Sequence, residues 1–419
     1  MERKGRAGIW LATILPFGLG FQLTVCYRTI NAILAQPIMA DLDLDSGQIG
    51  LATSTFALAF AAAQIPLGLL LDGWGARRTQ TVLFLVGAGG AAVIGSAHGL
   101  TTLALGGALL GVGMAGGLMA AFESIAERVE ARQVPFFNSI ILAVGGLGAL
   151  VATSPAKAFE SAHGWRALMF VLAGATVACA VLVFAVHRDV RHPEDAEHGL
   201  RERLRGLRRV VRDRSFWRVV PLLAATYGGF MGMQGLWLGP WLRHVVGVSP
   251  EIAAEYLSVL AMATIVGFLS DTFISRIAEV TGIGLATILA VASGLHVVTQ
   301  VMLVLDIGST HLATWFVYGY LAQMPILYFA VVTQHLERKV RGRALTAANI
   351  LVFLFMFGVQ FGFGSIVHAW PKLVDGGTVV SSYRAGMLVL IAIQAAALAW
   401  FVLFRPRHAT ERERADGAR

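Results

Sequence analysis

Between two long apolar runs lies the stretch G-L-L-L-D-G-W-G-A-R-R, from Gly68 to Arg78. A weaker copy, G-F-L-S-D-T-F-I-S-R, begins 199 residues later at Gly267. The positions that correspond at this offset are Gly68 and Gly267, Asp72 and Asp271, and Arg77 and Arg276. The copy has Ile274 where the first stretch has Gly75. This repeat predicts a chain made of two similar halves.

Apolar runs long enough to cross a bilayer fill most of the chain. A spanning helix needs about 20 mostly apolar residues, because lipid offers the backbone no hydrogen-bond partner. We count about twelve such runs in the sequence. They are Ile9–Pro37, Ser46–Leu71, Thr79–Ala97, Leu100–Ala126, Pro135–Phe159, Trp165–Val186, Trp217–Trp241, Glu251–Ser275, Ile283–Leu305, Leu312–Thr333, Ala344–Trp370 and Tyr383–Phe404. The sequence therefore predicts an all-α integral membrane protein with about 12 transmembrane helices in two six-helix bundles.

The composition excludes several classes of protein. Of the 419 residues, 56% are hydrophobic and 14% are charged, whereas soluble globular proteins carry about 25% charged residues. An ordinary soluble enzyme, a disordered chain and a disulfide scaffold are excluded. Cys26 and Cys179 both lie in apolar runs and indicate no zinc site. The net charge of +8 comes from short loops between apolar runs, which argues against nucleic-acid binding.

The distribution of Lys and Arg predicts the orientation in the membrane. With a cytoplasmic N-terminus, the inside segments contain 27 of these residues and the outside loops contain 5. The outside ones are Lys157, Arg166, Arg243, Lys372 and Arg384. The positive-inside rule then places both termini in the cytoplasm. Tryptophans near the span ends, among them Trp165, Trp241 and Trp315, are expected to be interfacial anchors.

The domain boundaries follow from the longest charged loop. We predict an N-terminal bundle over residues 1–187, a cytoplasmic linker over 188–215, a C-terminal bundle over 216–405 and a cytoplasmic tail over 406–419. The Arg-rich linker is interpreted as a solvated segment along the lipid headgroups, with a regulatory or partner-binding role as the alternative. Abundant Ala, Gly and Arg indicate a GC-rich bacterial source. We therefore expect a monomeric, multi-pass protein of a bacterial inner membrane.

The pattern G-x-x-x-D-x-x-G-x-R-R between the second and third spans resembles the signature loop of the major facilitator superfamily. The resemblance covers the whole chain. It implies two six-helix bundles around a central cavity that opens alternately to each side. Two subgroup signatures are missing: Gly107 replaces the helix-four Arg of proton-coupled members, and the run Ala143 to Val151 lacks the proline of drug exporters. Both absences argue against a proton-driven multidrug exporter.

The loop residues form a predicted gating motif. Gly75 gives the tight turn its backbone freedom, and Gly68 lets helices approach closely. Asp72 can pair with Arg77 or Arg78, or with a helix end opposite. Such contacts are expected to hold the bundles together on the inside only in the outward-open state. The second copy contributes Asp271 and Arg276. The alternative is a plain charged turn that sets the topology.

Arg28 is the candidate for substrate binding that the sequence favours most. It lies well inside a span, where an ionisable group costs about 2.5 to 3.5 kcal/mol. Asn31 shares its helix face and Tyr27 flanks it. The resemblance implies that helix one lines the cavity, where a guanidinium can bind a carboxylate or phosphate in a planar fork. A structural contact with a helix carbonyl is the alternative.

The R-x-x-N pattern of helix one is also similar to that of the organophosphate/phosphate antiporters of the superfamily. Those proteins use a second Arg in helix seven, where this chain has Gln234 in the interior of the helix. This difference argues against phosphate-ester exchange.

Further candidates lie in helices seven, nine and ten. Tyr227, Gln234 and Trp237 follow helical spacing and combine apolar faces with polar tips, which suits an organic solute. An aromatic packing stripe is the alternative for them. In helix ten, Tyr320 and Gln323 lie three residues apart. His296 in helix nine is a candidate proton carrier, although a lone membrane histidine is more often held by an interhelical hydrogen bond.

These residues predict transport rather than catalysis. The spans contain no acidic residue at mid-depth and no G-x-x-x-x-G-K-[ST] loop, so we expect no metal, no cofactor and no direct ATP drive. We predict a secondary active or facilitative transporter of a small, anionic organic solute, working by alternating access through symport, antiport or uniport. The alternatives are an efflux pump for drugs or amphipathic metabolites and a non-transporting sensor. A membrane enzyme would need a mid-depth cluster of reactive groups that the sequence lacks.

Overall fold

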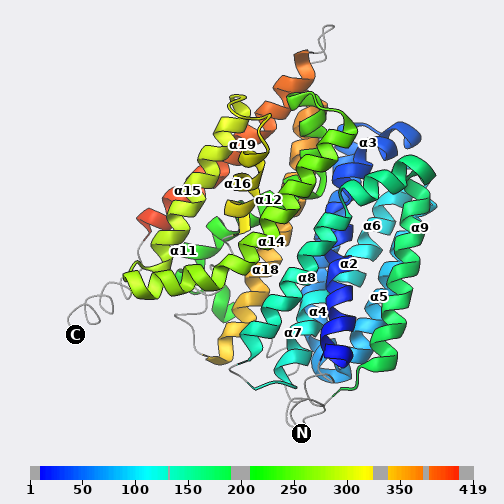
Figure 1. The fold of residues 1–419 in the computed structure, drawn as a ribbon, viewed down its shortest axis with the longest axis vertical. Helices are drawn as coiled ribbons and strands as arrows, with labels where there is room; N and C mark the ends of the chain where they lie inside the picture. Colours follow the sequence, from blue (N-terminus) through cyan, green and yellow to red (C-terminus); the bar gives the residue numbers. More distant parts are fainter. Residues whose placement is uncertain (1–9, 131–132, 190–207, 324–337, 371–376, 405–419) are drawn as a thin grey trace.

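The computed structural model describes residues 10–130, 133–189, 208–323, 338–370 and 377–404. Throughout this part of the chain the regular structure is helical, with no strand. Long helices run side by side through the height of the molecule (Figure 1). The all-α prediction is confirmed.

The first half of the chain forms helices up to His187. They are η1 (Trp10–Ile14), α2 (Leu15–Thr29), α3 (Asn31–Leu42), α4 (Ser46–Trp74), α5 (Ala76–Gly95), α6 (Leu100–Met114), α7 (Gly117–Ala126), α8 (Val134–Val151) and α9 (Ser154–Val186), where η denotes a π-helical segment.

The second half begins after residue 207. Its helices are α11 (Arg214–Leu223), η3 (Ala224–Gly228), α12 (Gly229–Gly232), η4 (Met233–Trp237), α13 (Leu238–Trp241), η5 (Leu242–Val246), α14 (Pro250–Thr281), α15 (Leu285–Val304), α16 (Leu312–Gln323), α18 (Arg338–Ala369) and α19 (Gly377–Leu403).

Several predicted spans are interrupted at identifiable residues. The first span breaks at Ile30, directly after Thr29, whose hydroxyl donates to the Val25 carbonyl oxygen at 2.9 Å. Such a back-bond competes with the helix ladder and bends the helix. The fifth predicted span, Pro135–Phe159, is too long: α8 ends at Val151, and α9 bends at Gly164, where φ is +81°.

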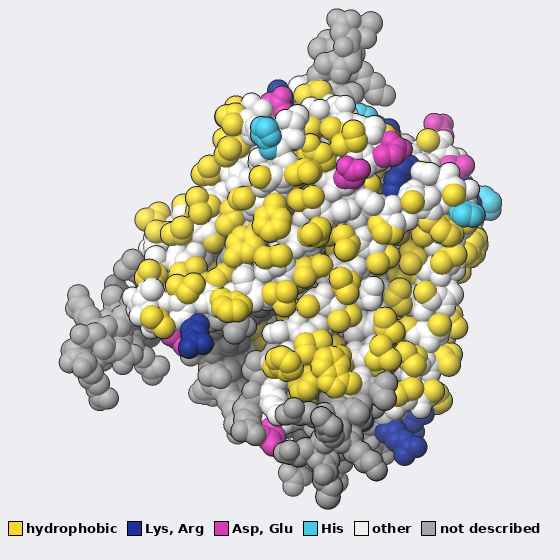
Figure 2. All heavy atoms as spheres, in the orientation of Figure 1, with side chains coloured by type: hydrophobic (Ala, Val, Ile, Leu, Met, Phe, Trp, Pro, Cys, Tyr) yellow, Lys and Arg dark blue, Asp and Glu magenta, His cyan; other side chains and the backbone are white. Residues whose placement is uncertain are grey.

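Eight stretches of described residues are long and apolar enough to cross a membrane. They are Ser46–Leu71, Ala76–Gly95, Leu100–Ala126, Phe136–Val186, Pro250–Ser270, Leu285–Val304, Arg343–Ala369 and Val380–Leu403. The longest of them contains both α8 and α9. In the view of Figure 2, apolar side chains cover the middle of the surface and charged ones gather toward the ends. The count of twelve spans stays a prediction, as do the positions of the termini.

Each half has extensive packing of its own, and two helix pairs make most of the contacts between the halves. In the first half α5 packs on α6 and α9, and α2 packs on α8. In the second half α14 packs on α16, and α15 on α19. The contacts between the halves run chiefly through α4 with α18 and α8 with α14. The exact domain boundaries stay a prediction.

Three of the expected interfacial tryptophans lie in the core instead. Trp165, Trp241 and Trp315 are buried, and the Trp315 indole donates to the Ser309 carbonyl oxygen at 2.8 Å. Their sequence positions near span ends were compatible with a lipid-facing ring, but the helices turn these rings inward. By contrast, Trp10 and Trp400 are exposed, as interfacial anchors are.

Candidate functional site

The signature loop is a tight turn between α4 and α5. Gly75, the single residue between the two helices, has φ +82°, a conformation that side chains rarely adopt. A Cβ at this position would also lie 2.6 Å from the Asp189 carboxylate. Two constraints therefore require glycine at this position: the backbone conformation and the close approach of the Asp189 side chain.

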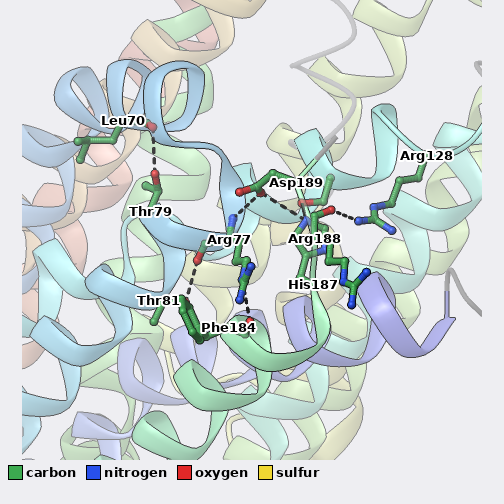
Figure 3. A network of polar contacts seen from close by, with 10 residues as sticks. Leu70, Arg77, Thr79, Thr81, Arg128, Phe184, His187, Arg188 and Asp189 are labelled. Atoms are coloured by element: carbon green, nitrogen blue, oxygen red, sulfur yellow. Dashed lines mark hydrogen bonds and ion pairs between the residues drawn. The ribbon is translucent and has the colours of Figure 1, made fainter. Parts of the chain in front are cut away.

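Asp189 ties this turn to the end of α9 (Figure 3). Its carboxylate accepts the Arg77 backbone N–H at 2.8 Å, in the first turn of α5. The Arg77 guanidinium donates to the Phe184 carbonyl oxygen at 2.7 Å and lies 4.1 Å from the Phe184 ring centroid. These contacts anchor the loop within the first half of the molecule. The sequence analysis did not single out Asp189.

The end of α7 joins the same network. His187 is buried, and its Nε2 lies 3.4 Å from the Ser124 hydroxyl and 3.8 Å from Asp189. Arg128 donates to the carbonyl oxygen of Arg188 (Figure 3). The ends of α5, α7 and α9 thus meet at the signature loop.

The remaining residues of the predicted gating motif make no such contacts with Asp189, or their side chains are not described by the structure. Arg78 and Arg276 are exposed, and Gly68 lies within α4. The side chains of Asp72 and Asp271 are outside the described residues. In the second copy, a Cβ at Gly267 would lie 2.7 Å from the Cβ of Gln323, so this glycine lets α14 approach α16.

Arg28 lies at the end of α2, next to the break at Ile30. Its side chain is half-buried, as is that of Asn31. The Arg28 Nε atom is shielded from solvent and has no hydrogen-bond partner among the described residues. A buried donor without a partner carries a desolvation penalty of about 1–3 kcal/mol. The guanidinium therefore has capacity left for a ligand.

The second-half helix that faces Arg28 alternates between α and π turns. Its π segments are η3, η4 and η5, and it is buried almost throughout. Because π turns shift the register, the stripe expected for a regular helix is not continuous. Tyr227 is half-buried, whereas Gln234, Trp237 and Trp241 are buried.

Trp237 joins the two halves through packing. Its indole nitrogen donates to the Gln360 carbonyl oxygen at 3.0 Å, and its ring stacks on Phe363 at 5.1 Å. A Cβ added at Gly50, in the first half, would lie 3.3 Å from the Cζ2 atom of the indole. These contacts engage both its polar tip and its face.

Three other candidates are engaged within one half. The Tyr27 hydroxyl lies 3.0 Å from that of Thr176, between α2 and α9. His296 is buried and stacks on Tyr318 at 4.9 Å. Gln323 is buried against Gly267, whereas Tyr320 is half-buried. The half-buried candidates are thus Arg28, Asn31, Tyr227 and Tyr320.

Close backbone contacts seal one end of the molecule. We call this the distal end and define it by the turns at Asp43, Gly164 and Gly247. A Cβ at Gly239 would overlap the carbonyl oxygen of Ala32, and one at Gly235 would lie 2.7 Å from that of Arg28. These contacts join α3 and the end of α2 to η4 and α13.

A second glycine pair seals the crossing of α4 and α18. A Cβ at Gly50 would lie 2.7 Å from the Gln360 carbonyl oxygen, and one at Gly364 would lie 2.5 Å from that of Ser46. Glycines permit such close helix contacts because they lack a side chain. Neither glycine pair could be singled out from the sequence, because the chain contains 47 glycines.

Polar contacts between the halves add to this seal. Gln36 Nε2 lies 3.3 Å from His244 Nε2, and Asp45 Oδ1 lies 3.4 Å from His368 Nδ1. The hydroxyls of Ser154 and Ser258 lie 3.0 Å apart. The distal end is therefore closed by direct contact between the halves.

A bundle of apolar helices in two halves, closed at one end, with a half-buried cation next to the closure, is the architecture of a multi-pass membrane transporter. Residues 16–359 match the family model of the Major Facilitator Superfamily. The chain belongs to this superfamily of transporters, which confirms the resemblance stated from the signature loop.

Among curated proteins, the chain is similar to two bacterial transporters. It is 24% identical over 267 residues to the "Probable sulfoacetate transporter SauU" of Cupriavidus necator, covering 60% of this chain and 62% of that protein. It is 24% identical over 249 residues to the "Nitrite extrusion protein" of Bacillus subtilis, covering 58% of this chain and 60% of that protein. The chain thus spans about six-tenths of the length of these curated relatives.

Solved structures share the fold. A bacterial homologue of the human lysosomal transporter Spinster, in an inward-facing and unoccupied conformation, has a TM-score of 0.70 at 18% identity. The match covers 93% of this chain and 95% of that one. At this identity the likeness concerns the fold alone.

Proposed function

We propose that the protein is a secondary transporter that moves a small organic anion by alternating access. The observation that carries the proposal is the Arg28 side chain at the end of α2, in the first predicted span: it is half-buried, and its shielded Nε has no hydrogen-bond partner among the described residues. A permanent positive charge at membrane depth is costly, so such a residue usually marks a functional site. A carboxylate or sulfonate would supply the missing hydrogen bonds through the guanidinium fork.

The relatives support an anionic substrate. One is named for sulfoacetate and the other for nitrite, and both compounds are anions. We propose that Asn31, Tyr227 and Tyr320, the other half-buried candidates, complete the site with Arg28. Tyr27 and Trp237 are then packing residues, since hydrogen bonds already engage their polar atoms. His296 stacks on Tyr318 and Gln323 packs against Gly267, but the His296 ring nitrogens and the Gln323 Oε1 have no hydrogen-bond partner among the described residues.

The proposed orientation follows from charge. The distal end faces the outside, because the predicted inside segments contain 27 Lys and Arg residues and the outside loops contain 5. The transporter is then closed to the outside in this structure, and the signature loop lies on the cytoplasmic side of a bacterial inner membrane. Substrate direction depends on the gradients, since alternating access is reversible.

The experiment is a counterflow assay in proteoliposomes with sulfoacetate, nitrite, a neutral sugar and an organic cation as separate solutes. We expect flux of at least one anion, and its loss in Arg28→Gln. Arg384→Gln is the matched control, because Arg384 is also half-buried with a shielded, unpartnered Nε. Flux of cations with none of anions would favour the efflux-pump alternative. No flux of any solute would favour a sensor.

A further inference from the structure

A pocket of about 310 Å³ opens at the distal end between the two halves. Ala32 and Gly239, the residues of the tightest crossing, both line it. Gln36 and Lys157 contribute from the first half, and Arg243 contributes from the second. The pocket therefore lies directly on the distal side of the seal.

The pocket carries two basic side chains from opposite halves. The Lys157 ammonium is 2.8 Å from the Glu160 carboxylate, so one of its three donors is engaged. Arg243 is half-buried, and the carboxylate of Glu251 lies close enough to interact electrostatically with both Lys157 and Arg243. Two of the five basic residues in the predicted outside loops thus line one pocket.

Arg243 and Arg28 flank the seal. Arg28 precedes Ala32 by four residues, about one helical turn, on the side away from the pocket. Arg243 follows Gly239 by four residues, about one turn farther toward the distal end. An anion that leaves one guanidinium when the seal opens would meet the other about two turns away.

We propose that this pocket is a docking site for the transported anion on the outer side of the closed gate. It takes a small carboxylate or sulfonate, held by the Arg243 guanidinium and the Lys157 ammonium. The inference rests on the proposed function, because it assigns the same cargo to a second site.

The first experiment measures exchange of labelled sulfoacetate, or of nitrite if that is the anion carried, into right-side-out vesicles at low ionic strength. In Arg243→Gln we expect the KM for the external anion to rise about five- to twenty-fold, with an unchanged maximal rate and a smaller effect at high salt. The double variant Lys157→Gln/Glu160→Gln, which removes the ion pair without leaving a lone carboxylate, should act in the same direction. Arg166→Gln is the control, because Arg166 is paired with Asp41 and does not line the pocket.

The second experiment separates this inference from the proposed function. In purified Arg28→Gln, calorimetric titration with the same anion should show weak residual binding, which Arg28→Gln/Arg243→Gln loses. An unchanged KM in Arg243→Gln, or residual binding that persists in the double variant, overturns the docking site while leaving the role of Arg28 intact. Normal anion flux in Arg28→Gln would overturn the proposed function instead.

Discussion

The carbonyl oxygen of Ala32 occupies the space that a side chain on Gly239 would need. Backbone therefore meets backbone where α3 crosses α13, and no side chain can separate the two halves at this point. Arg28 lies four residues before Ala32, at the end of α2 and across the break at Ile30. The closure of the distal end and the position of the proposed binding residue are thus fixed by one crossing.

Gly239→Ala should destabilise the closed distal end. An added methyl group must push the helices apart, and overpacking of this kind costs about 1–3 kcal/mol. Each 1.4 kcal/mol shifts the equilibrium between closed and open states about ten-fold. The measurement is the rate at which an impermeant maleimide, added on the distal side, labels Asn31→Cys.

The native cysteines should not interfere, because Cys26 and Cys179 are buried. Gly358→Ala in α18 is the matched control, since a Cβ there meets nothing within 4 Å. Equal labelling rates in Gly239→Ala and Gly358→Ala would show that the crossing does not hold the distal end closed.

Gly75→Ala should destabilise the protein, whereas Gly73→Ala should not. Alanine at position 75 must adopt φ +82° with ψ +165°, a region populated almost only by glycine, and displace the Asp189 carboxylate; the backbone conformation alone costs about 1–3 kcal/mol. A Cβ at Gly73 meets nothing within 4 Å. Thermal unfolding in detergent measures the difference, and equal melting temperatures for the two variants would contradict this account of the loop.

Asp72→Asn should reduce transport about ten-fold or more while leaving membrane insertion normal. Asp72 lies in the last turn of α4, beside the loop that Asp189 anchors. The physical reason is that we propose this charge to help close the inner side in the outward-open state. Counterflow and expression level are measured together, and full transport by the variant would remove Asp72 from the gate.

Acid should weaken the closed distal end through His244. Burial lowers the pKa of His244, and the positive charge of Arg243 lowers it further. The neutral ring can accept the Gln36 amide hydrogen, whereas the protonated ring has no free lone pair. The contribution of this contact is therefore full above the ordinary histidine pKa of about 6.5 and is lost as the pH falls below it.

Maleimide labelling of Asn31→Cys between pH 8 and pH 5 measures this effect. The His368→Gln background removes the second histidine at the seal, which faces Asp45. We expect faster labelling at acid pH after correction for reagent reactivity, and no such change when His244→Gln is added. A pH dependence that persists without His244 would assign the effect to another group.

Much of the fold could be predicted from the sequence because the membrane restricts it. In apolar runs of about 20 residues or more, the backbone N–H and C=O groups cannot bond to lipid and must pair within the segment, which favours helices. The signature loop from Gly68 to Arg78 identified the family, and Gly75 lies at the turn as its residue type implied. The span ends were harder to predict: the fifth predicted span runs to Phe159, whereas α8 ends at Val151.

The contacts that define the site could not be predicted, because they depend on how the helices are oriented. Asp189 lies 112 residues from Arg77, and only the fold brings them together. The π turns around Gln234 and Trp237 shift the register that regular spacing assumes. The role of Gly239 depends on its facing the Ala32 carbonyl, which its residue type alone does not reveal.

Equilibrium binding of a labelled organic anion to the purified protein tests the central claim most directly, with wild type, Arg28→Lys and Arg28→Gln compared. We expect saturable binding by the wild type, weaker binding by Arg28→Lys, which keeps the charge but loses the planar fork, and loss of high-affinity binding in Arg28→Gln. Undiminished affinity in Arg28→Gln would show that the guanidinium at the end of α2 does not hold the cargo, and would contradict the assignment of this transporter to anions through that residue.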